Sequence, residues 1–279
     1  MPRLIHLSDL HFGAHDPQLV EAVERRIDEE KPDLVVISGD FTQRAKTDEF
    51  KEACRFLDRL KNAGHDVLGV PGNHDVPLYD VLRRFLSPLT RYRRFIDETL
   101  CPYHSVDGAA VLGINTARSL TFKDGRISHE QMDFIRRTFD RAGDVPRILV
   151  THHPLFALPV GEGPAVGDGI GRQELALDAI ADAGVDILLA GHNHRASTHS
   201  ARDLATRAGP ALVIQAGTAT STRLRDEAQS FNRIDVTGER VTLTVQAWDG
   251  NGFVSGDEQT YAREGEDWRL AHRPVGAEA

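Results

Sequence analysis

The chain has 279 residues, enough for one large α/β domain or two ordinary ones, and either would bury sufficient apolar surface to fold without disulfides. Its 33 lysines and arginines are outnumbered by 42 aspartates and glutamates, so the net charge of −9 argues against a nucleic-acid polymer as the main partner. Cys54 and Cys101 are too few for a disulfide framework and are typical of a reducing compartment.

The N-terminus reads MPRLIHLSD, and its apolar part is too short for a signal peptide. No apolar stretch approaches the length that spans a bilayer. We therefore expect a cytoplasmic protein without a membrane span. The 13 histidines, several of them paired or next to aspartate, favour metal or acid–base chemistry.

The first half of the chain alternates short apolar runs with amphipathic helical stretches, the pattern of a βαβ protein. Helices are expected from Pro17, after a cap at Asp16, from a cap at Thr47 to Gly64, and from a capping box at Ser128 to about Ala142. Strands are expected at 3–7, 34–38, 67–70, 103–106, 109–115, 147–150 and 187–190. A Gly-rich loop and a further helix separate the last two strands.

After residue 210 the pattern changes to strands joined by turns, which predicts antiparallel pairing. Strands are expected at 211–216, 231–236 and 241–248, and the last two meet at Thr237-Gly238. No internal repeat, low-complexity tract or Ser/Pro linker is visible. We therefore expect one domain over residues 1–262, built on two packed sheets, and a polar, loosely held tail over 263–279.

Five apolar runs pass directly into polar residues that can bind metals: LIHLSDLH, VVISGD, VLGVPGNHD, RILVTHH and ILLAGHNH. Because the carboxyl ends of parallel strands form one edge of a sheet, these residues are expected to converge. Carboxylate, imidazole and amide oxygen suit Mn, Fe, Zn or Co, and the absence of cysteine argues against a structural zinc site. The candidates are Asp9, His11, Asp40, Asn73, His74, Asp75, His152, His153, His192 and His194.

Each of these segments taken singly has an ordinary structural explanation. A DxH, a GD or an HxH is common, and a lone histidine is more often a hydrogen-bonded structural residue than a ligand. Five such segments, all at predicted strand ends, form a far more specific pattern. Gly39, Gly72 and Gly191 lie beside them, where a missing side chain lets the backbone turn and a metal or substrate approach.

The ordered set SDLH, GD, GNHD, HHP and GHNH resembles the motifs of the calcineurin-like metallophosphoesterase superfamily. The resemblance spans residues 9–194 and implies an α/β fold, a four-layered α/β/β/α sandwich of two mixed sheets flanked by helices. It also implies two divalent or mixed-valence metal ions and a hydroxide shared between them as the nucleophile for in-line attack. By this resemblance Asp40 bridges two ligand sets, one of Asp9, His11 and His194 and the other of Asn73, His152 and His192.

The resemblance implies catalytic roles for two more residues. His74 would lie beside the phosphate as a proton donor or charge stabiliser, and Asp75 would orient the His74 imidazole. His153 is expected to support the site rather than to ligate, because the family places its ligand at the first histidine of such a pair.

Within the superfamily the chain departs from the serine/threonine protein phosphatases, which carry GDxVDRG and GNHE. It is more similar to the bacterial class III cyclic-nucleotide phosphodiesterases, so a 3',5'-cyclic nucleotide such as cAMP is the leading expected substrate, although Leu155 stands where that group usually has a second proline. The alternatives are another phosphodiester, a lipid pyrophosphate or a phosphomonoester. A small phosphate ester is thus the expected partner, and a homodimer is possible.

The basic stretch from Arg83 to Phe95 has several interpretations. A solvated helix face is favoured over a phosphate-binding or lipid-surface role, because arginines are mostly exposed whatever their use. Its apolar residues Phe85, Leu86, Leu89 and Phe95 are more typical of a core than of an interface, but they are also compatible with a cap over the site or a subunit contact. Two further classes of function remain as alternatives: a non-catalytic metal-binding scaffold, disfavoured because every ligand position is filled, and a nuclease, disfavoured by the acidic charge.

Overall fold

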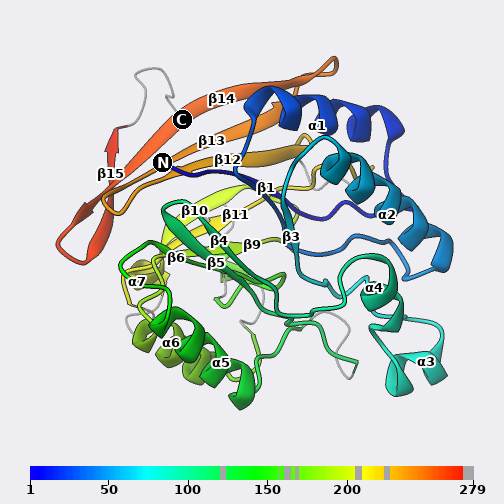
Figure 1. The fold of residues 1–279 in the computed structure, drawn as a ribbon, viewed down its shortest axis with the longest axis horizontal. Helices are drawn as coiled ribbons and strands as arrows, with labels where there is room; N and C mark the ends of the chain where they lie inside the picture. Colours follow the sequence, from blue (N-terminus) through cyan, green and yellow to red (C-terminus); the bar gives the residue numbers. More distant parts are fainter. Residues whose placement is uncertain are drawn as a thin grey trace.

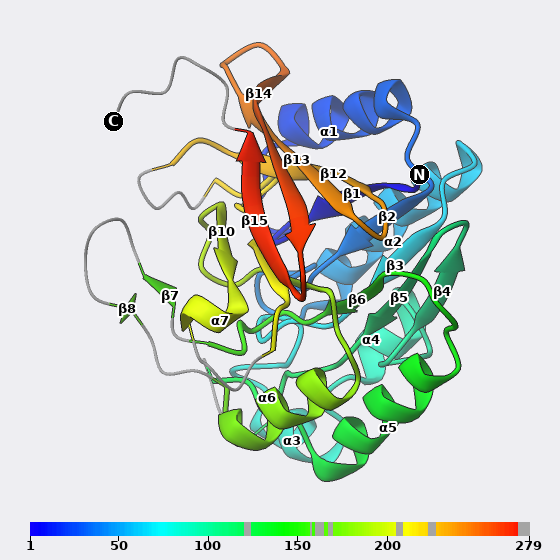
Figure 2. The ribbon, with the colours of Figure 1, turned by 90° about the vertical axis from the view of Figure 1, so that its left-hand side faces the viewer.

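The fold was analysed in a computed structural model that describes residues 1–119, 124–156, 158–159, 165–166, 170–204, 209–222 and 227–272. Two β-sheets pack face to face, and helices cover the outer face of each (Figure 1). Figure 2 shows the same layers from the side. The expected four-layered α/β/β/α sandwich of two mixed sheets is confirmed.

The first sheet has seven strands in the order β15-β14-β13-β12-β1-β2-β3. β1, β2 and β3 run parallel, whereas β12 pairs antiparallel with β1 and begins an antiparallel meander. The strands are β1 (Arg3–Leu7), β2 (Leu34–Ile37), β3 (Val67–Gly69), β12 (Ser230–Val236), β13 (Arg240–Trp248), β14 (Phe253–Glu264) and β15 (Asp267–His272).

The second sheet has six strands in the order β10-β11-β9-β6-β5-β4. Its four central strands run parallel, and β10 and β4 are antiparallel edges. The strands are β4 (Tyr103–Val106), β5 (Ala109–Gly113), β6 (Arg147–Val150), β9 (Ile187–Ala190), β10 (Ser197–Ser200) and β11 (Leu212–Gln215). A separate short pair joins β7 (Leu158–Pro159) to β8 (Ala165–Val166), and most of the Gly-rich loop expected there lies outside the described residues.

The helices divide between the two outer faces (Figure 1). α1 (Pro17–Glu30) and α2 (Thr47–Asn62) cover the first sheet, and α5 (His129–Asp140) and α6 (Gln173–Asp182) cover the second. Two short helices, α3 (Val81–Leu86) and α4 (Thr90–Phe95), follow β3, and α7 (Ala201–Leu204) follows β10. Among the described residues, no helix combines the length and the apolar character that a membrane crossing requires.

Three hydrophobic clusters hold the layers together, and strand periodicity explains how. In β1, Ile5 and Leu7 pack against the outer helices, whereas Leu4 faces the second sheet. Leu112 and Leu149 of the second sheet face α5 and α6 in the same way. Since both sheets are covered on both faces, their parallel strands are continuous apolar runs, which is why the sequence marks them so clearly.

The expected polar tail is partly wrong. Asp267–His272 forms β15, which pairs with β14. Trp268 anchors this strand, because its side chain is 3% exposed and its indole N–H donates to the carbonyl of Asp186 at 3.1 Å. Only residues 273–279 of the expected tail remain, and they lie outside the described residues.

The stretch from Arg83 to Phe95 divides into two parts. Tyr92 of α4 is fully buried and Leu89, just before this helix, is 8% exposed, so this part joins the core around α2. In α3 the apolar residues Leu82, Phe85 and Leu86 remain exposed. The stretch as a whole therefore does not form a cap over the site.

Candidate metal centre

The seven candidate ligands lie just beyond the carboxyl ends of five parallel strands. The first sheet supplies four of them and the second sheet supplies three, so they meet where the rims of the two sheets face each other. Asp9 and His11 follow β1, Asp40 follows β2, Asn73 follows β3, His152 follows β6, and His192 and His194 follow β9.

One ligand cluster contains Asp9, His11 and His194, all buried. The Nε2 atom of His194 lies 3.1 Å from Oδ1 of Asp9 and 3.2 Å from Nε2 of His11. Oδ1 of Asp9 is 3.6 Å from Nε2 of His11. Three potential ligand atoms thus point at one small volume.

A second cluster contains Asn73, His152 and His192. The amide Oδ1 of Asn73 lies 3.0 Å from Nε2 of His152 and 3.1 Å from Nδ1 of His192. Those two ring nitrogens are 3.3 Å apart. On its other side the His152 ring donates from Nδ1 to the carbonyl of Ser38 at 2.7 Å, which leaves Nε2 without a proton in the neutral ring and free to ligate.

Asp40 links the two clusters. Its Oδ2 atom lies 3.8 Å from Nε2 of His11 in one cluster and 3.5 Å from Nε2 of His152 in the other. Its Oδ1 atom accepts a hydrogen bond from the backbone N–H of His74 at 2.8 Å. The carboxylate is therefore oriented with one oxygen between both clusters, as a bridging ligand requires.

The chemistry of these atoms fits bound cations. Two ligands that share one ion at bonds of about 2.1 Å lie roughly 3 Å apart, which matches the spacing within each cluster. Oδ1 of Asp9 is buried beside the ring nitrogens of His194, at 3.1 Å, and His11, at 3.6 Å. A buried carboxylate is costly unless a positive charge compensates it, and a cation held by this carboxylate and these two imidazoles would do so.

Protonation also fits metal binding, which needs ionised carboxylates and neutral imidazoles. Burial opposes the ionisation of Asp9, but the neighbouring His194 and His11 outweigh it and hold the pKa of the Asp9 carboxyl well below its usual range. The pKa of Asp40 is lowered in the same way by His152 against the effect of burial. Burial, together with His152, lowers the pKa of His192 to about 4.

Backbone conformation singles out the same residues. Of the eight described non-glycine residues with positive φ, five are candidate ligands: Asp9, His11, Asp40, His192 and His194. This conformation is unfavourable for residues with a Cβ, and it persists where the surroundings impose it, commonly at functional sites. The strand ends are bent so that the ligands turn inward.

Two glycines make room for the ligands. A Cβ on Gly72 would lie 2.1 Å from Oδ1 of Asp40, and a Cβ on Gly39 would lie 2.6 Å from Nδ1 of His152. Gly39 also has a φ of +97°. Both positions therefore need glycine for close approach to a ligand.

The structure brings His74 to the edge of the site. Its Nδ1 donates to the backbone carbonyl of Gln43 at 2.8 Å, and its ring packs edge-on against His11 with ring centroids 4.8 Å apart. His74 is partly exposed, unlike His11 and Asp40.

The expectation that Asp75 orients the His74 imidazole is wrong. The Asp75 carboxylate instead accepts hydrogen bonds from the backbone N–H groups of Phe41, Thr42 and Gly72 and from the Thr42 hydroxyl, at 2.9 to 3.2 Å. Burial, with the neighbouring Asp40 charge, raises the pKa of Asp75 to about 7. Asp75 thus ties the loop after β3 to the loop after β2, and the Gln43 carbonyl orients His74.

His153 lies next to the second cluster, with one ring nitrogen within 4.8 Å of the ligand atoms of His152 and His192. Its Nδ1 shares a 2.8 Å hydrogen bond with the Thr116 hydroxyl. Burial and the two neighbouring histidines lower the pKa of His153 well below its usual range.

Sequence reasoning missed several residues that hold the ligands in place. The hydroxyl of Ser8 donates to Oδ2 of Asp9 at 2.6 Å. Thr218 and Thr220 donate to the backbone carbonyls of Asp9 and Leu10 at 2.8 and 2.7 Å. Both threonines follow β11, so the rule that polar residues after an apolar strand reach this rim would have found them.

A family model described as calcineurin-like phosphoesterase matches residues 2–196, which include all seven candidate ligands. Together with the fold and the paired ligand clusters, this match defines a metal-dependent phosphoesterase. The chain belongs to the calcineurin-like phosphoesterase family.

Curated relatives include phosphodiesterases. The chain is 25% identical over 224 residues to glycerophosphodiester phosphodiesterase GpdQ of Enterobacter lignolyticus, in a match that covers 76% of this chain and 78% of that protein. A probable GpdQ of Arcobacter nitrofigilis is 28% identical over 170 residues, covering 60% and 59%.

Solved structures share the fold at low identity. A dimetal phosphatase from Danio rerio superposes with a TM-score of 0.63 at 13% identity, covering 91% of this chain and 99% of that chain. The purple acid phosphatase PPD1 from yellow lupin gives 0.69 at 13% identity, covering 95% and 54%. These likenesses support the fold alone.

Proposed function

We propose that this protein is a two-metal phosphodiesterase that hydrolyses a small phosphate diester. The observation that carries this proposal is the pair of ligand clusters joined by Asp40, whose Oδ2 lies within 3.8 Å of a histidine nitrogen in each cluster. Two bound cations would lower the pKa of water and neutralise charge on the phosphoryl oxygens.

In this proposal Asp9, His11 and His194 would hold one ion and Asn73, His152 and His192 would hold the other, with Asp40 available to both. His74 is the proton donor to the leaving oxygen. Nδ1 of His74 donates to the Gln43 carbonyl, so Nε2 carries a proton that it can give to the substrate only when the ring is an imidazolium. Asp75 contributes by fixing the loop that presents His74.

Two substrate classes have specific support. The motif resemblance favours a 3',5'-cyclic nucleotide such as cAMP, and the GpdQ relatives, which are named as glycerophosphodiester phosphodiesterases, favour a glycerophosphodiester. Lipid pyrophosphates and phosphomonoesters are further alternatives. A cytoplasmic location and a homodimer stay predictions, and light scattering would test the homodimer.

The test is a substrate panel on protein reconstituted with Mn, Fe, Zn or Co. The panel compares bis(4-nitrophenyl) phosphate, cAMP, glycerophosphodiesters, a lipid pyrophosphate and 4-nitrophenyl phosphate. We expect metal-dependent turnover of diesters well above that of the monoester. Stoichiometric metal without turnover of any ester would instead indicate a scaffold.

A further inference from the structure

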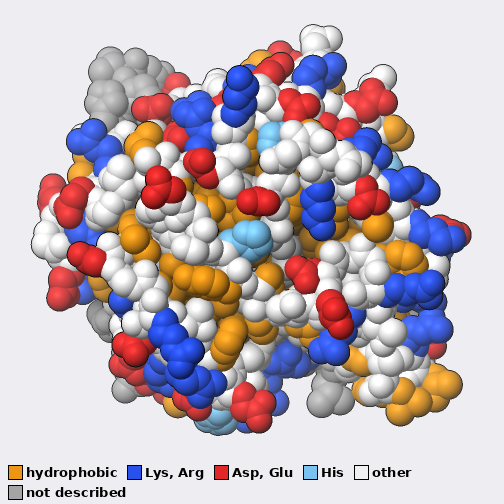
Figure 3. All heavy atoms as spheres, in the orientation of Figure 1, with side chains coloured by type: hydrophobic (Ala, Val, Ile, Leu, Met, Phe, Trp, Pro, Cys, Tyr) orange, Lys and Arg blue, Asp and Glu red, His pale blue; other side chains and the backbone are white. Residues whose placement is uncertain are grey.

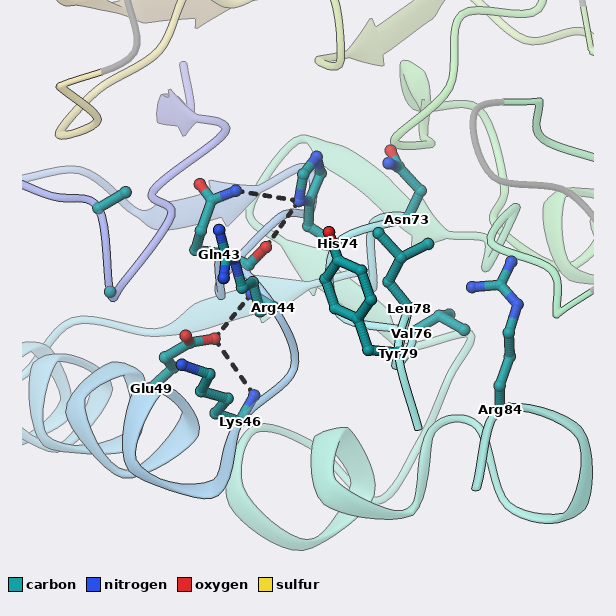
Figure 4. A pocket seen from close by; sticks show the side chains of 12 residues that line it. Gln43, Arg44, Lys46, Glu49, Asn73, His74, Val76, Leu78, Tyr79 and Arg84 are labelled. Atoms are coloured by element: carbon teal, nitrogen blue, oxygen red, sulfur yellow. Dashed lines mark hydrogen bonds between the residues drawn. The ribbon is translucent and has the colours of Figure 1, made fainter. Parts of the chain in front are cut away.

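A pocket of about 810 Å³ opens beside the candidate metal centre. The candidate ligand Asn73 and its neighbour His74 line the part of the pocket next to the metal centre, and Gln43, Arg44 and Lys46 line the side formed by the loop after β2 (Figure 4). Leu78 and Tyr79, from the segment before α3, line the outer side. A diester whose phosphorus sits at the metal centre would therefore place one substituent in this pocket.

The pocket carries positive charge in a chain whose net charge is −9. Arg44 and Lys46 are exposed, and neither forms an ion pair with the carboxylates that the structure describes. The one acidic residue in the lining, Glu49, is 7% exposed, and its Oε2 accepts from the backbone N–H groups of Arg44 at 2.7 Å and Lys46 at 3.2 Å. The Glu49 carboxylate thus stabilises the loop after β2 through these two hydrogen bonds.

The same pocket has an apolar and aromatic side. The Arg44 guanidinium lies 5.9 Å from the centre of the Tyr79 ring, and Val76 and Leu78 continue this surface. Arg84 fixes the wall from beneath, because it is 4% exposed and donates to the carbonyls of Pro77 and Ser119. The lining therefore suits a planar or apolar group that ends in an anion.

We propose that this pocket binds a second anionic group on the substrate, a carboxylate or phosphate on the diester's substituent, with Arg44 and Lys46 as the specificity-determining residues. The inference rests on the proposed phosphodiesterase function, since it places the scissile phosphate at the metal centre. A cyclic mononucleotide has no second anionic group, so the pocket favours a diester whose substituent itself carries a carboxylate or a phosphate.

The kinetic test uses two diesters of nearly the same shape. Bis(4-nitrophenyl) phosphate and 4-carboxyphenyl 4-nitrophenyl phosphate share a leaving group and differ by a nitro group in place of a carboxylate. We expect Arg44→Met and Lys46→Met each to lower the ratio of kcat/KM for the carboxylate diester to that for the nitro diester, and the double variant to lower it on the order of tenfold. Comparison with wild type cancels the intrinsic reactivity of the esters.

The matched control is Lys51→Met, which removes an exposed cation on α2 outside the pocket and should keep the wild-type ratio. An unchanged ratio in the double variant would overturn the inference. This includes an equal loss on both diesters, which would place Arg44 and Lys46 at the scissile phosphate instead.

A binding measurement separates this inference from the proposed function. Calorimetric titration of the metal-loaded protein with 4-carboxyphenylphosphonate and 4-nitrophenylphosphonate, which are not hydrolysed, should show tighter binding of the carboxylate by on the order of tenfold in wild type, lost in the double variant. If the carboxylate binds more tightly but no diester is hydrolysed, the anion-binding pocket is supported and the proposed phosphodiesterase function is rejected. If diesters are hydrolysed but the two phosphonates bind with equal affinity, the phosphodiesterase function is supported and the anion-binding pocket is rejected.

Discussion

Asp40 and His74 lie close together, but we expect their replacement by alanine to have different effects on metal content and turnover. Asp40 is within reach of both ligand clusters, so Asp40→Ala should deplete bound metal and abolish turnover. His74→Ala should keep the metal and lower kcat by about 10²- to 10⁴-fold, the usual contribution of a general acid. Elemental analysis and diester kinetics on both variants distinguish these outcomes.

The assigned role of His74 as a proton donor that does not ligate a metal can be contradicted in two ways. Its nearest ring nitrogen lies within 4.8 Å of ligand atoms of His11 and Asp40, so the geometry alone admits it as a ligand. Metal loss in His74→Ala would show that it ligates, and wild-type turnover would refute its role as proton donor.

His6 gives a prediction for the pH dependence of stability. This residue is fully buried next to Ser38, and burial lowers its pKa from the ordinary 6.5 to about 3, against a small opposing effect of Asp9. Between those pH values the unfolded chain binds a proton that the folded chain does not. The contribution of His6 to stability is therefore complete above pH 6.5 and lost as the pH falls, by about 1.4 kcal/mol per pH unit.

The variant His6→Gln keeps a polar side chain and cannot titrate, so its stability should fall less steeply between pH 7 and pH 5. Urea unfolding at pH 7, 6 and 5, with chelator throughout to exclude metal loss, measures both slopes. Parallel slopes for the variant and wild type would contradict the prediction.

At the scale of elements, the turn after β3 is tightly constrained. Gly72→Ala would bring a Cβ against Asp40 and displace the shared carboxylate. We expect loss of metal and activity and a destabilisation of about 1–3 kcal/mol. Gly238→Ala is the matched control, because nothing lies within 4 Å of its added Cβ. Unimpaired metal binding in Gly72→Ala would show that the turn is not constrained.

Elements with a strong apolar signal were predictable from the sequence, and those without it were not. β1, β2, β6 and β9 are buried on both faces, so their apolar runs identified the strands, and the polar residues after them gave the candidate ligands that the structure brings together. β10 reads Ser-Thr-His-Ser and half of β14 is exposed, so neither carries an alternating apolar pattern. Their pairing depends on neighbouring strands instead.

Contacts between loops were equally invisible to sequence reasoning. The order GNHD suggested that Asp75 serves its neighbour His74, but the Asp75 side chain points to the loop after β2. Gln43 and Arg44 carried no signal of their own, because their roles arise from where that loop meets the segment after β3.

At the scale of the whole molecule, the candidate centre joins the two halves of the sandwich. Figure 3 shows one face of the molecule, on which hydrophobic side chains lie among lysines, arginines, aspartates and glutamates. Asp9, His11, Asp40 and Asn73 come from the first sheet, and the three other ligands come from the second. Ions held by residues of both sheets would bind only the folded chain, so their removal should destabilise it.

At a free metal concentration about a hundred times Kd, each ion would add about 2.7 kcal/mol, and the midpoint of thermal unfolding should rise by about 5 °C or more. Calorimetry with and without chelator measures this shift. Asp40→Ala should show little of it, and an equal shift in that variant would place the stabilising ions elsewhere.

The most direct test of the two-metal centre is the metal content of the purified, reconstituted protein, measured by plasma mass spectrometry after removal of loosely bound ions. We predict two ions per chain in wild type, together with hydrolysis of bis(4-nitrophenyl) phosphate. Protein that retains no stoichiometric metal under any of the four metals, while remaining folded, would contradict the account.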